Sequence, residues 1–328
     1  LKEKEITTLF TSEYSKESPD GDVQFLCDGI ITIAFKAERT IEVSKFRGSN
    51  FHKGVHAVNL TDRGMEIFPK LIPRNNDEEL HASNLKPMSS GVPEIDMLLE
   101  GGIEPTTVSV ITGPSGVGKT TLGMQFIKEA AGRGDRSVVY VFEEALSTLL
   151  RRCESVNIPV MAMIDRGTLK IIKMEPLATT AEEFANRVRD DIETNGTKIV
   201  MLDSISGYRL CFKEGDLVRN MHNLAQYLRS MKVTTIITNE IETITGDFKA
   251  TESGISYLAD NLLFLRYLEI QGTISKAIGV LKKRLSGFEN TMREFSITRY
   301  GIRVGEPLTN LRRILSGTPE FFDDHRNK

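Results

Sequence analysis

Residues 113–120 read Gly-Pro-Ser-Gly-Val-Gly-Lys-Thr. This stretch has the form G-x-x-x-x-G-K-T, in which glycines turn backbone N–H groups inward around a polyphosphate. An apolar, β-branched run over residues 107–111 precedes it, and residues 121–131 after it have helical spacing. Strand, glycine loop and helix in this order favour an anion at the helix N-terminus. The alternative, a glycine turn that arises by chance, does not explain this context.

The loop predicts a specific role for each of its last two residues. Lys119 supplies a positive charge to the outer phosphates, and the Thr120 hydroxyl can ligate Mg²⁺. We therefore expect a nucleotide site lined by Gly113, Pro114, Ser115, Gly116, Val117, Gly118, Lys119, Thr120 and Thr121.

Composition narrows the class of protein. The chain has 328 residues, 40% of them hydrophobic and 27% charged, and a formal net charge of −3, which does not favour nucleic acid or acidic membranes as partners. No apolar run reaches membrane-spanning length. The three cysteines lie far apart with no C-x-x-C pair, which predicts reduced, buried thiols in a cytoplasmic protein.

Strands and helices alternate after the loop. Apolar strands are expected at 137–142, 169–172, 199–202 and 233–238, and helices at 146–153, 180–194 and 217–231, after a short helix within 89–99. This alternation predicts an α/β fold with a parallel sheet covered on both faces. Hairpin spacing then predicts an antiparallel extension of the sheet, with strands at 261–268, 276–283 and 292–298.

The first 70 residues read as strands without a phosphate loop, at 6–11, 29–35, 41–46 and 55–60. They repeat later sequence in the same order: 6–13 resembles 233–240, 28–33 resembles 260–265, 43–51 resembles 280–288 and 60–64 resembles 297–301. We infer that residues 1–70 are the C-terminal part of an earlier copy of the following domain. Residues 71–87 are then a linker, 88–317 the complete domain and 318–328 a tail.

Carboxylates follow two of the predicted strands. Asp203 comes directly after the apolar run 199–202, as expected of an aspartate that holds Mg²⁺ beside the phosphates, although it could also cap the next helical turn. Glu143 and Glu144 follow another buried strand, and strand ends converge on the ligand in a parallel sheet. We expect one of them to polarise a water or hydroxyl, with Glu143 also near the metal; the alternative is a solvated helix start.

Further polar residues can complete such a site. Asn239 ends the strand 233–238 and could contact the γ-phosphate. Lys282, Lys283 and Arg284 follow a predicted strand and recur as Lys45 and Arg47 in the first copy. They could form a solvated strand edge. Their recurrence favours a phosphate-contacting group offered to a neighbouring subunit, which would assemble a ring.

These motifs together resemble the KaiC family, the circadian-clock ATPases of the RecA superfamily. The resemblance covers almost the whole chain and rests on Ser90–Asp96, Thr112–Thr120, Phe142–Glu144, Leu202–Ser204, Tyr267–Ile270, Lys282–Arg284, Arg293–Phe295 and Ile314–Pro319. It implies a RecA-like P-loop domain, a hexameric ring with ATP and Mg²⁺ between subunits, slow ATP hydrolysis, and phosphorylation of the protein's own serine and threonine.

Residue by residue, the resemblance implies that Glu143 and Glu144 form a catalytic pair. It implies that Lys282 and Arg284 reach ATP from the adjacent subunit, and that Lys276 falls on another basic position near the ATP. Ser256 matches a phosphorylated serine, but Tyr257 stands where the family has its phosphorylated threonine, and Thr251 is an alternative acceptor. From residue chemistry alone, Ser256 is an ordinary hydroxyl.

Two other classes of function stay open at this stage. One is a nucleotide-switched binding module whose output is a signalling or clock-type protein partner. The other is a RecA/RadA-like DNA-dependent ATPase, against which the acidic balance counts.

Overall fold

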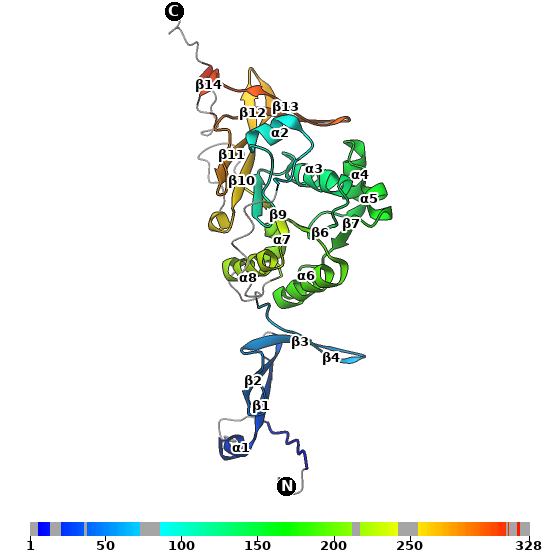
Figure 1. Ribbon diagram of the computed structural model, residues 1–328, viewed down its shortest axis with the longest axis vertical. Helices are drawn as coiled ribbons and strands as arrows, with labels where there is room; N and C mark the ends of the chain where they lie inside the picture. Colours follow the sequence, from blue (N-terminus) through cyan, green and yellow to red (C-terminus); the bar gives the residue numbers. More distant parts are fainter. Residues whose placement is uncertain are drawn as a thin grey trace, which may run out of the picture. The chain divides into compact units, whose positions relative to one another are not determined.

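The computed structural model describes residues 6–13, 21–35, 38–72, 86–211, 217–241, 255–312, 314 and 320–321. The chain divides into two compact units, Leu1–Lys70 and Leu71–Lys328 (Figure 1). In the described ranges, no helix is long and apolar enough to cross a bilayer.

The second unit is built on a nine-stranded sheet in the order β13-β12-β11-β10-β5-β9-β8-β6-β7. The first part of this unit forms parallel strands: β5 (Val108–Gly113), β6 (Ser137–Val141), β7 (Leu169–Lys173), β8 (Ile199–Asp203) and β9 (Thr234–Glu240). The antiparallel part comprises β10 (Asn261–Ile270), β11 (Thr273–Lys283), β12 (Arg293–Thr298) and β13 (Gly301–Pro307). β10 joins the two parts because it pairs in parallel with β5 and antiparallel with β11. The predicted α/β fold with an antiparallel extension is therefore confirmed.

Helices cover both faces of this sheet. One apolar cluster contains residues of α2 (Pro93–Leu98), α3 (Lys119–Gly132), α4 (Leu146–Ser155) and α5 (Val160–Asp165). The other contains residues of α6 (Ala181–Asn195), α7 (Ile205–Arg209) and α8 (Leu217–Ser230). The local sequence specifies both ends of helix α6. The Thr180 hydroxyl accepts a hydrogen bond from the Glu183 N–H at its start, and Gly196 ends it with a left-handed φ of 63°. The sequence did not predict α5, α7 or β13; the two helices are too short to show a period.

The first unit is a four-stranded antiparallel sheet preceded by a short helix. Its elements are α1 (Gly21–Leu26), β1 (Gly29–Phe35), β2 (Arg39–Phe46), β3 (Val55–Thr61) and β4 (Gly64–Phe68). The strand predicted at 6–11 is wrong, because residues 6–13 form neither strand nor helix. The similar segment, β9, lies between β5 and β8, whereas no strand flanks residues 6–13 within the described part of the chain. A strand needs such neighbours to satisfy its backbone groups.

The β1–β2 and β10–β11 hairpins have matching details. Each carries a register shift after its second residue pair, between Ile30 and Ile31 and between Leu262 and Leu263. In each, an arginine just beyond the second strand pairs with the aspartate that precedes the first: Arg47 with Asp28, and Arg284 with Asp260. This agreement supports the interpretation of residues 1–70 as part of an earlier copy.

The cysteines differ in burial. Cys153 and Cys211 are buried free thiols, as predicted, but Cys27 is partly exposed. It follows α1 in the first unit, where little core is available to cover it. The prediction of three buried thiols is thus wrong for Cys27. Burial raises the pKa of the Cys153 thiol to about 11.

Candidate nucleotide-binding site

The phosphate loop runs from the end of β5 to the start of α3, and two of its glycines are required by close contacts. A Cβ on Gly113 would lie 2.5 Å from the Leu265 carbonyl oxygen, and one on Gly118 would lie 2.6 Å from Ile297 Cδ1. Gly118 also has φ 121°, which side chains rarely adopt. The antiparallel strands β10 and β12 therefore press against the loop and restrict its shape.

Lys119 lies inside the loop with only 8% of its surface exposed. Its Nζ donates hydrogen bonds to the carbonyl oxygens of Gly113 at 2.9 Å and Pro114 at 2.8 Å. Glu240 Oε2 lies 3.7 Å from the same nitrogen. Burial lowers the pKa of Lys119, and the nearby carboxylates of Glu240, Asp203 and Glu143 oppose this shift. The ammonium group is thus held where the predicted phosphates would lie.

Asp203 connects the phosphate loop to two strand ends. Its Oδ1 accepts hydrogen bonds from the Thr120 hydroxyl at 3.1 Å and from the Thr238 hydroxyl at 2.5 Å. Strand β8 supplies Asp203 and the neighbouring β9 supplies Thr238, so the parallel register brings them together. A carboxylate and hydroxyl oxygens are ligands that suit Mg²⁺. Sequence reasoning missed Thr238, whose only signal was its place near the end of a predicted strand.

The two adjacent glutamates after β6 have different partners. Glu143 is exposed, and its Oε1 accepts a hydrogen bond from the Ser204 hydroxyl at 3.1 Å, next to Asp203. Glu144 Oε2 instead pairs with the Arg152 guanidinium at 2.7 Å. Burial raises the pKa of Glu144, Arg152 opposes the shift and Asp203 adds to it. Glu143 is therefore the member of the pair tied to the predicted metal position.

Asn239 and Lys276 both lie against the loop or the strand that leads into it. The buried Asn239 amide donates to the Thr112 hydroxyl on β5 at 3.1 Å. Lys276 on β11 donates to the Gly116 carbonyl at 3.2 Å, and Tyr267 on β10 donates from its hydroxyl to the Ser115 carbonyl at 3.2 Å. Lys276 thus contacts the phosphate loop of its own chain. Burial lowers the pKa of Lys276.

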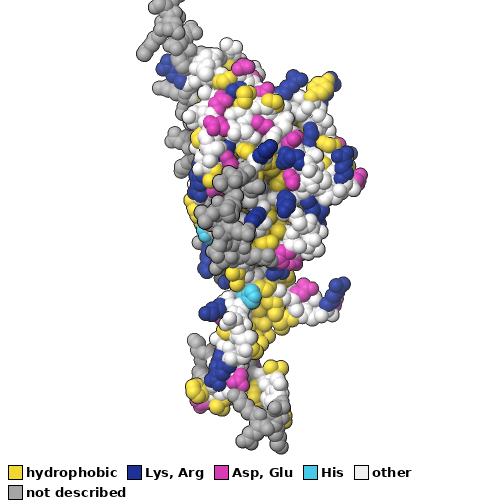
Figure 2. All heavy atoms as spheres, in the orientation of Figure 1, with side chains coloured by type: hydrophobic (Ala, Val, Ile, Leu, Met, Phe, Trp, Pro, Cys, Tyr) yellow, Lys and Arg dark blue, Asp and Glu magenta, His cyan; other side chains and the backbone are white. Residues whose placement is uncertain are grey.

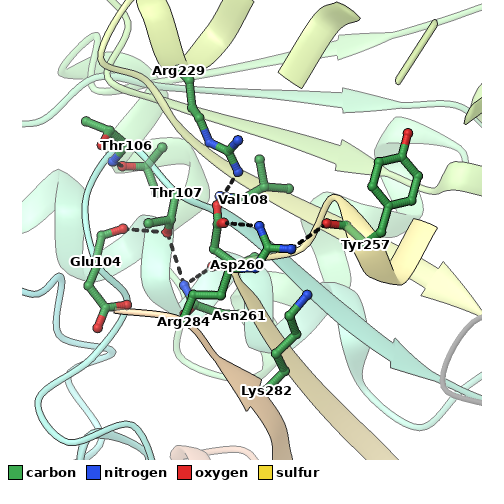
Figure 3. A network of polar contacts seen from close by, with 12 residues as sticks. Glu104, Thr106, Thr107, Val108, Arg229, Tyr257, Asp260, Asn261, Lys282 and Arg284 are labelled. Atoms are coloured by element: carbon green, nitrogen blue, oxygen red, sulfur yellow. Dashed lines mark hydrogen bonds and ion pairs between the residues drawn. The ribbon is translucent and has the colours of Figure 1, made fainter. Parts of the chain in front are cut away.

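The basic run at the end of β11, Lys282 to Arg284, separates into two environments. Lys282 donates to the Ser256 carbonyl at 3.0 Å. Arg284 donates to the Tyr257 carbonyl at 2.8 Å and pairs with Asp260 at 3.3 Å (Figure 3). Lys283 points the other way, into the protein, where it is buried and pairs with Glu104 at 2.9 Å. Its burial fits a structural role rather than the predicted nucleotide contact.

Asp260 holds this corner of the fold together. Its Oδ2 accepts from Arg229 at 2.5 Å and from the Val108 N–H at 2.9 Å, while Oδ1 faces Arg284 (Figure 3). A helix, the strand before the phosphate loop and the basic run therefore share one carboxylate. The sequence indicated Asp260 only through the repeat, as the match of Asp28.

The predicted modification residues are only partly described. Ser256 is exposed within a 3₁₀ turn, Ile255–Tyr257, that ends three residues before Asp260. The Tyr257 ring stacks on His222 of α8, with ring centroids 6.2 Å apart. Thr251 lies outside the described residues. In the ranges that the structure describes, no three His, Cys, Asp or Glu side chains gather into a metal site of their own.

Comparison with known proteins agrees with this geometry. The model of the family described as "ATPase: KaiC" matches residues 1–72 and 88–309. "Circadian clock oscillator protein KaiC" of Acaryochloris marina (strain MBIC 11017) is 30% identical, over 97% of this chain and 62% of that protein. The proteins of the same name from Nostoc sp. (strain PCC 7120) and Synechococcus elongatus (strain ATCC 33912) are 30% and 29% identical over the same shares. The chain therefore spans less than two thirds of the length of these relatives. Because the family match covers both units and includes the phosphate loop with its threonine–aspartate pair, the chain belongs to the KaiC family of ATPases and has its RecA-like P-loop fold.

Proposed function

We propose that this chain binds ATP with Mg²⁺ around Lys119 and hydrolyses it. The observation that carries the proposal is the convergence of Thr120, Asp203 and Glu143 beside the buried Lys119 ammonium. Thr120, Asp203 and Glu143 would hold Mg²⁺, which neutralises phosphate charge when bound. Lys119 would exchange its carbonyl partners on Gly113 and Pro114 for phosphate oxygens. The loop N–H groups at the start of α3 would hold the remaining phosphate charge.

We assign the base to Glu143 rather than Glu144. Glu143 is exposed and reaches toward Asp203 through Ser204, so it can accept a proton from an attacking water near the metal. Glu144 is held by Arg152, which favours its charged form while burial disfavours it. In this proposal Glu144 orients the segment after β6, and Glu143 performs the proton transfer.

The site is proposed to be completed by a second copy of the chain. Lys282 and Arg284 hydrogen-bond to residues 256–260, outside the phosphate loop, and both side chains remain partly exposed. In a closed ring, these cations would reach the nucleotide of the next protomer. The resemblance to the KaiC family implies that this ring is a hexamer. A cytoplasmic location and signalling or clock-type partners remain predictions.

Transfer of phosphate to the protein itself is a further part of the proposal. Ser256 is exposed and its carbonyl already contacts Lys282, one of the proposed phosphate-binding cations. With Tyr257 in place of a second hydroxyl acceptor of the family type, we expect labelling at Ser256, with Thr251 as the alternative.

One experiment tests these assignments together. The chain is incubated with γ-labelled ATP and Mg²⁺, and released phosphate and labelled protein are measured for the wild type, Glu143→Gln, Glu144→Gln and the control Glu269→Gln, an exposed carboxylate on β10. We expect Glu143→Gln to lower phosphate release about a hundredfold or more, as loss of a general base does. The control should match the wild type.

The other outcomes distinguish the alternatives. Unchanged release by Glu143→Gln would refute the base assignment. ATP-dependent assembly with neither release nor label would favour a nucleotide-switched module. Stimulation of release by duplex DNA would favour a DNA-dependent ATPase instead.

A further inference from the structure

A carboxylate that the proposed mechanism does not use faces the phosphate-binding lysine. Glu240 is the last residue of β9, and parallel pairing places it directly opposite Gly113, the first residue of the phosphate loop. Its Oε2 lies 3.7 Å from Lys119 Nζ. The backbone fixes the position of Glu240, because strand pairing holds it opposite Gly113 and the next residue, Ile241, donates its N–H to the Gly113 carbonyl at 3.2 Å.

The other carboxylates near Lys119 have separate partners. Asp203 accepts hydrogen bonds from Thr120 and Thr238, and Glu143 accepts one from Ser204. Glu240 Oε2, at 3.7 Å from Lys119 Nζ, lies within ion-pair distance of the ammonium. It therefore compensates the lysine charge in the nucleotide-free protein.

The ion pair between Glu240 and Lys119 must be weakened when a polyphosphate binds in the loop. The Lys119 ammonium has three N–H donors, of which two are taken by the Gly113 and Pro114 carbonyls. Glu240 provides the nearby negative charge, so an incoming phosphate oxygen competes with it for the same positive charge. The Glu240 side chain is 39% exposed, so it can turn toward solvent, but its charge stays near the phosphates. Like charges at such separations repel each other substantially when they are partly shielded from water.

We propose that Glu240 is a positioning residue that acts through Lys119 and weakens nucleotide binding in proportion to the phosphate charge near the loop. The inference rests on the proposed function, since it requires that Lys119 binds nucleotide phosphates. Glu240 makes the site discriminate against bare polyphosphate and makes binding depend more strongly on Mg²⁺, which neutralises part of the phosphate charge.

The test is a set of dissociation constants for Glu240→Gln, which removes the charge and retains the shape. ATP, ADP and AMP are titrated by calorimetry, each with Mg²⁺ and with a chelator. We expect ATP to bind about three- to tenfold more tightly to Glu240→Gln than to the wild type, ADP to gain less and AMP to be unchanged. The gain for ATP should be larger with the chelator. Glu240→Asp, which keeps the charge, and Glu269→Gln should resemble the wild type.

Each other outcome overturns the inference in a distinguishable way. If the wild type binds ATP and Glu240→Gln binds it equally or more weakly, Glu240 does not oppose phosphate and the inference alone fails. An equal gain for AMP would show a general change of the site rather than charge repulsion. If the wild type binds no nucleotide, the proposed function fails as well. Thermal melting checks folding, and Glu240→Ala provides a second neutral variant with the same expected direction.

Discussion

The β1–β2 hairpin and the β10–β11 hairpin share a register shift and an aspartate–arginine pair, yet their surroundings differ. In β10 the residues from Asn261 to Leu265 are buried, and the strand pairs with β11 and β5. In β1 the side chains of Ile31, Ile33 and Phe35 are 60%, 58% and 72% exposed. Among described residues, β1 pairs only with β2. Hydrophobic side chains are accordingly visible on the surface of the first unit (Figure 2).

This difference separates what a short sequence encodes from what its neighbours add. Both hairpins place a lysine on carbonyls of the helical segment before the first strand: Lys45 on Gln24 and Phe25, and Lys282 on Ser256. That arrangement forms within each hairpin and the segment before it. Burial of Asp260, at 10% exposure against 55% for Asp28, requires β5 and α8.

The largest expected contrast concerns the two aspartates. Asp260→Ala should lower the free energy of unfolding of the second unit by about 3 kcal/mol, because Arg229, Arg284 and the Val108 N–H lose their shared acceptor. The matched variant Asp28→Ala breaks an exposed pair and should cost less than about 1 kcal/mol.

Hydrogen exchange measures the two hairpins separately. Asp260→Ala should accelerate exchange in residues 261–283, and Asp28→Ala should change little in residues 29–46. Equal effects of the two substitutions would show that burial does not set the difference between the hairpins.

The second contrast concerns the matched lysines Lys282 and Lys45. Lys282→Ala should lower ATP hydrolysis roughly tenfold, because a cation that completes a neighbour's site is lost. Lys45→Ala should leave hydrolysis unchanged, since the described part of the first unit has no phosphate loop. Phosphate release in the presence of Mg²⁺ is the measurement.

Mixing variants tests whether Lys282 acts between subunits. Lys282→Ala and Glu143→Gln proteins are each expected to be slow. In mixed assemblies, a Glu143→Gln protomer can offer its Lys282 to a protomer with an intact Glu143, so activity should partly return. No recovery in verified mixed assemblies would place the action of Lys282 within its own chain.

The smallest expected effect on stability concerns the loop that follows the second strand of each hairpin, β11 in one and β2 in the other. Glu289 accepts hydrogen bonds from Arg293 and Thr291, and these bonds lower the pKa of Glu289 while burial opposes them. Because the folded-state pKa is lowered, the stabilisation is present above the carboxylate's usual pKa and is lost as pH falls through the lower, folded-state value. The matching positions in the first unit are His52 and His56, whose rings meet edge to face.

Arg293→Gln should therefore destabilise the protein by up to about 1 kcal/mol at neutral pH and by less in acid. Melting temperatures at about pH 7 and about pH 3 measure this change. An equal loss at both values would show that packing of Arg293, rather than the Glu289 charge, provides the stability. His56→Gln is the matched substitution in the first unit.

The sequence predicted most of the second unit and most residues of the proposed site. It singled out residues 113–120, Asp203 and Glu143 because phosphate loops and charged strand ends leave local signatures. The sequence did not predict β4 or β13, and it predicted a strand at 6–11 that the structure does not contain. It also missed Thr238, Tyr267 and Glu240 as residues around the loop. These three reach it through strand pairing, which no local pattern reports.

By itself, the sequence determined the phosphate loop, the alternation of strands and helices, and the repeated aspartate, lysine and arginine of the two hairpins. The first two depend on short motifs or on the periodicity of one element, and the third shows because the same residues recur in both copies. Tertiary structure alone decided that Lys276 lies on its own loop, that Lys283 is buried against Glu104, and that Glu240 faces Lys119. Those positions are fixed by the packing of strands that lie far apart in the chain, because the side chains that meet there depend on sheet order and register.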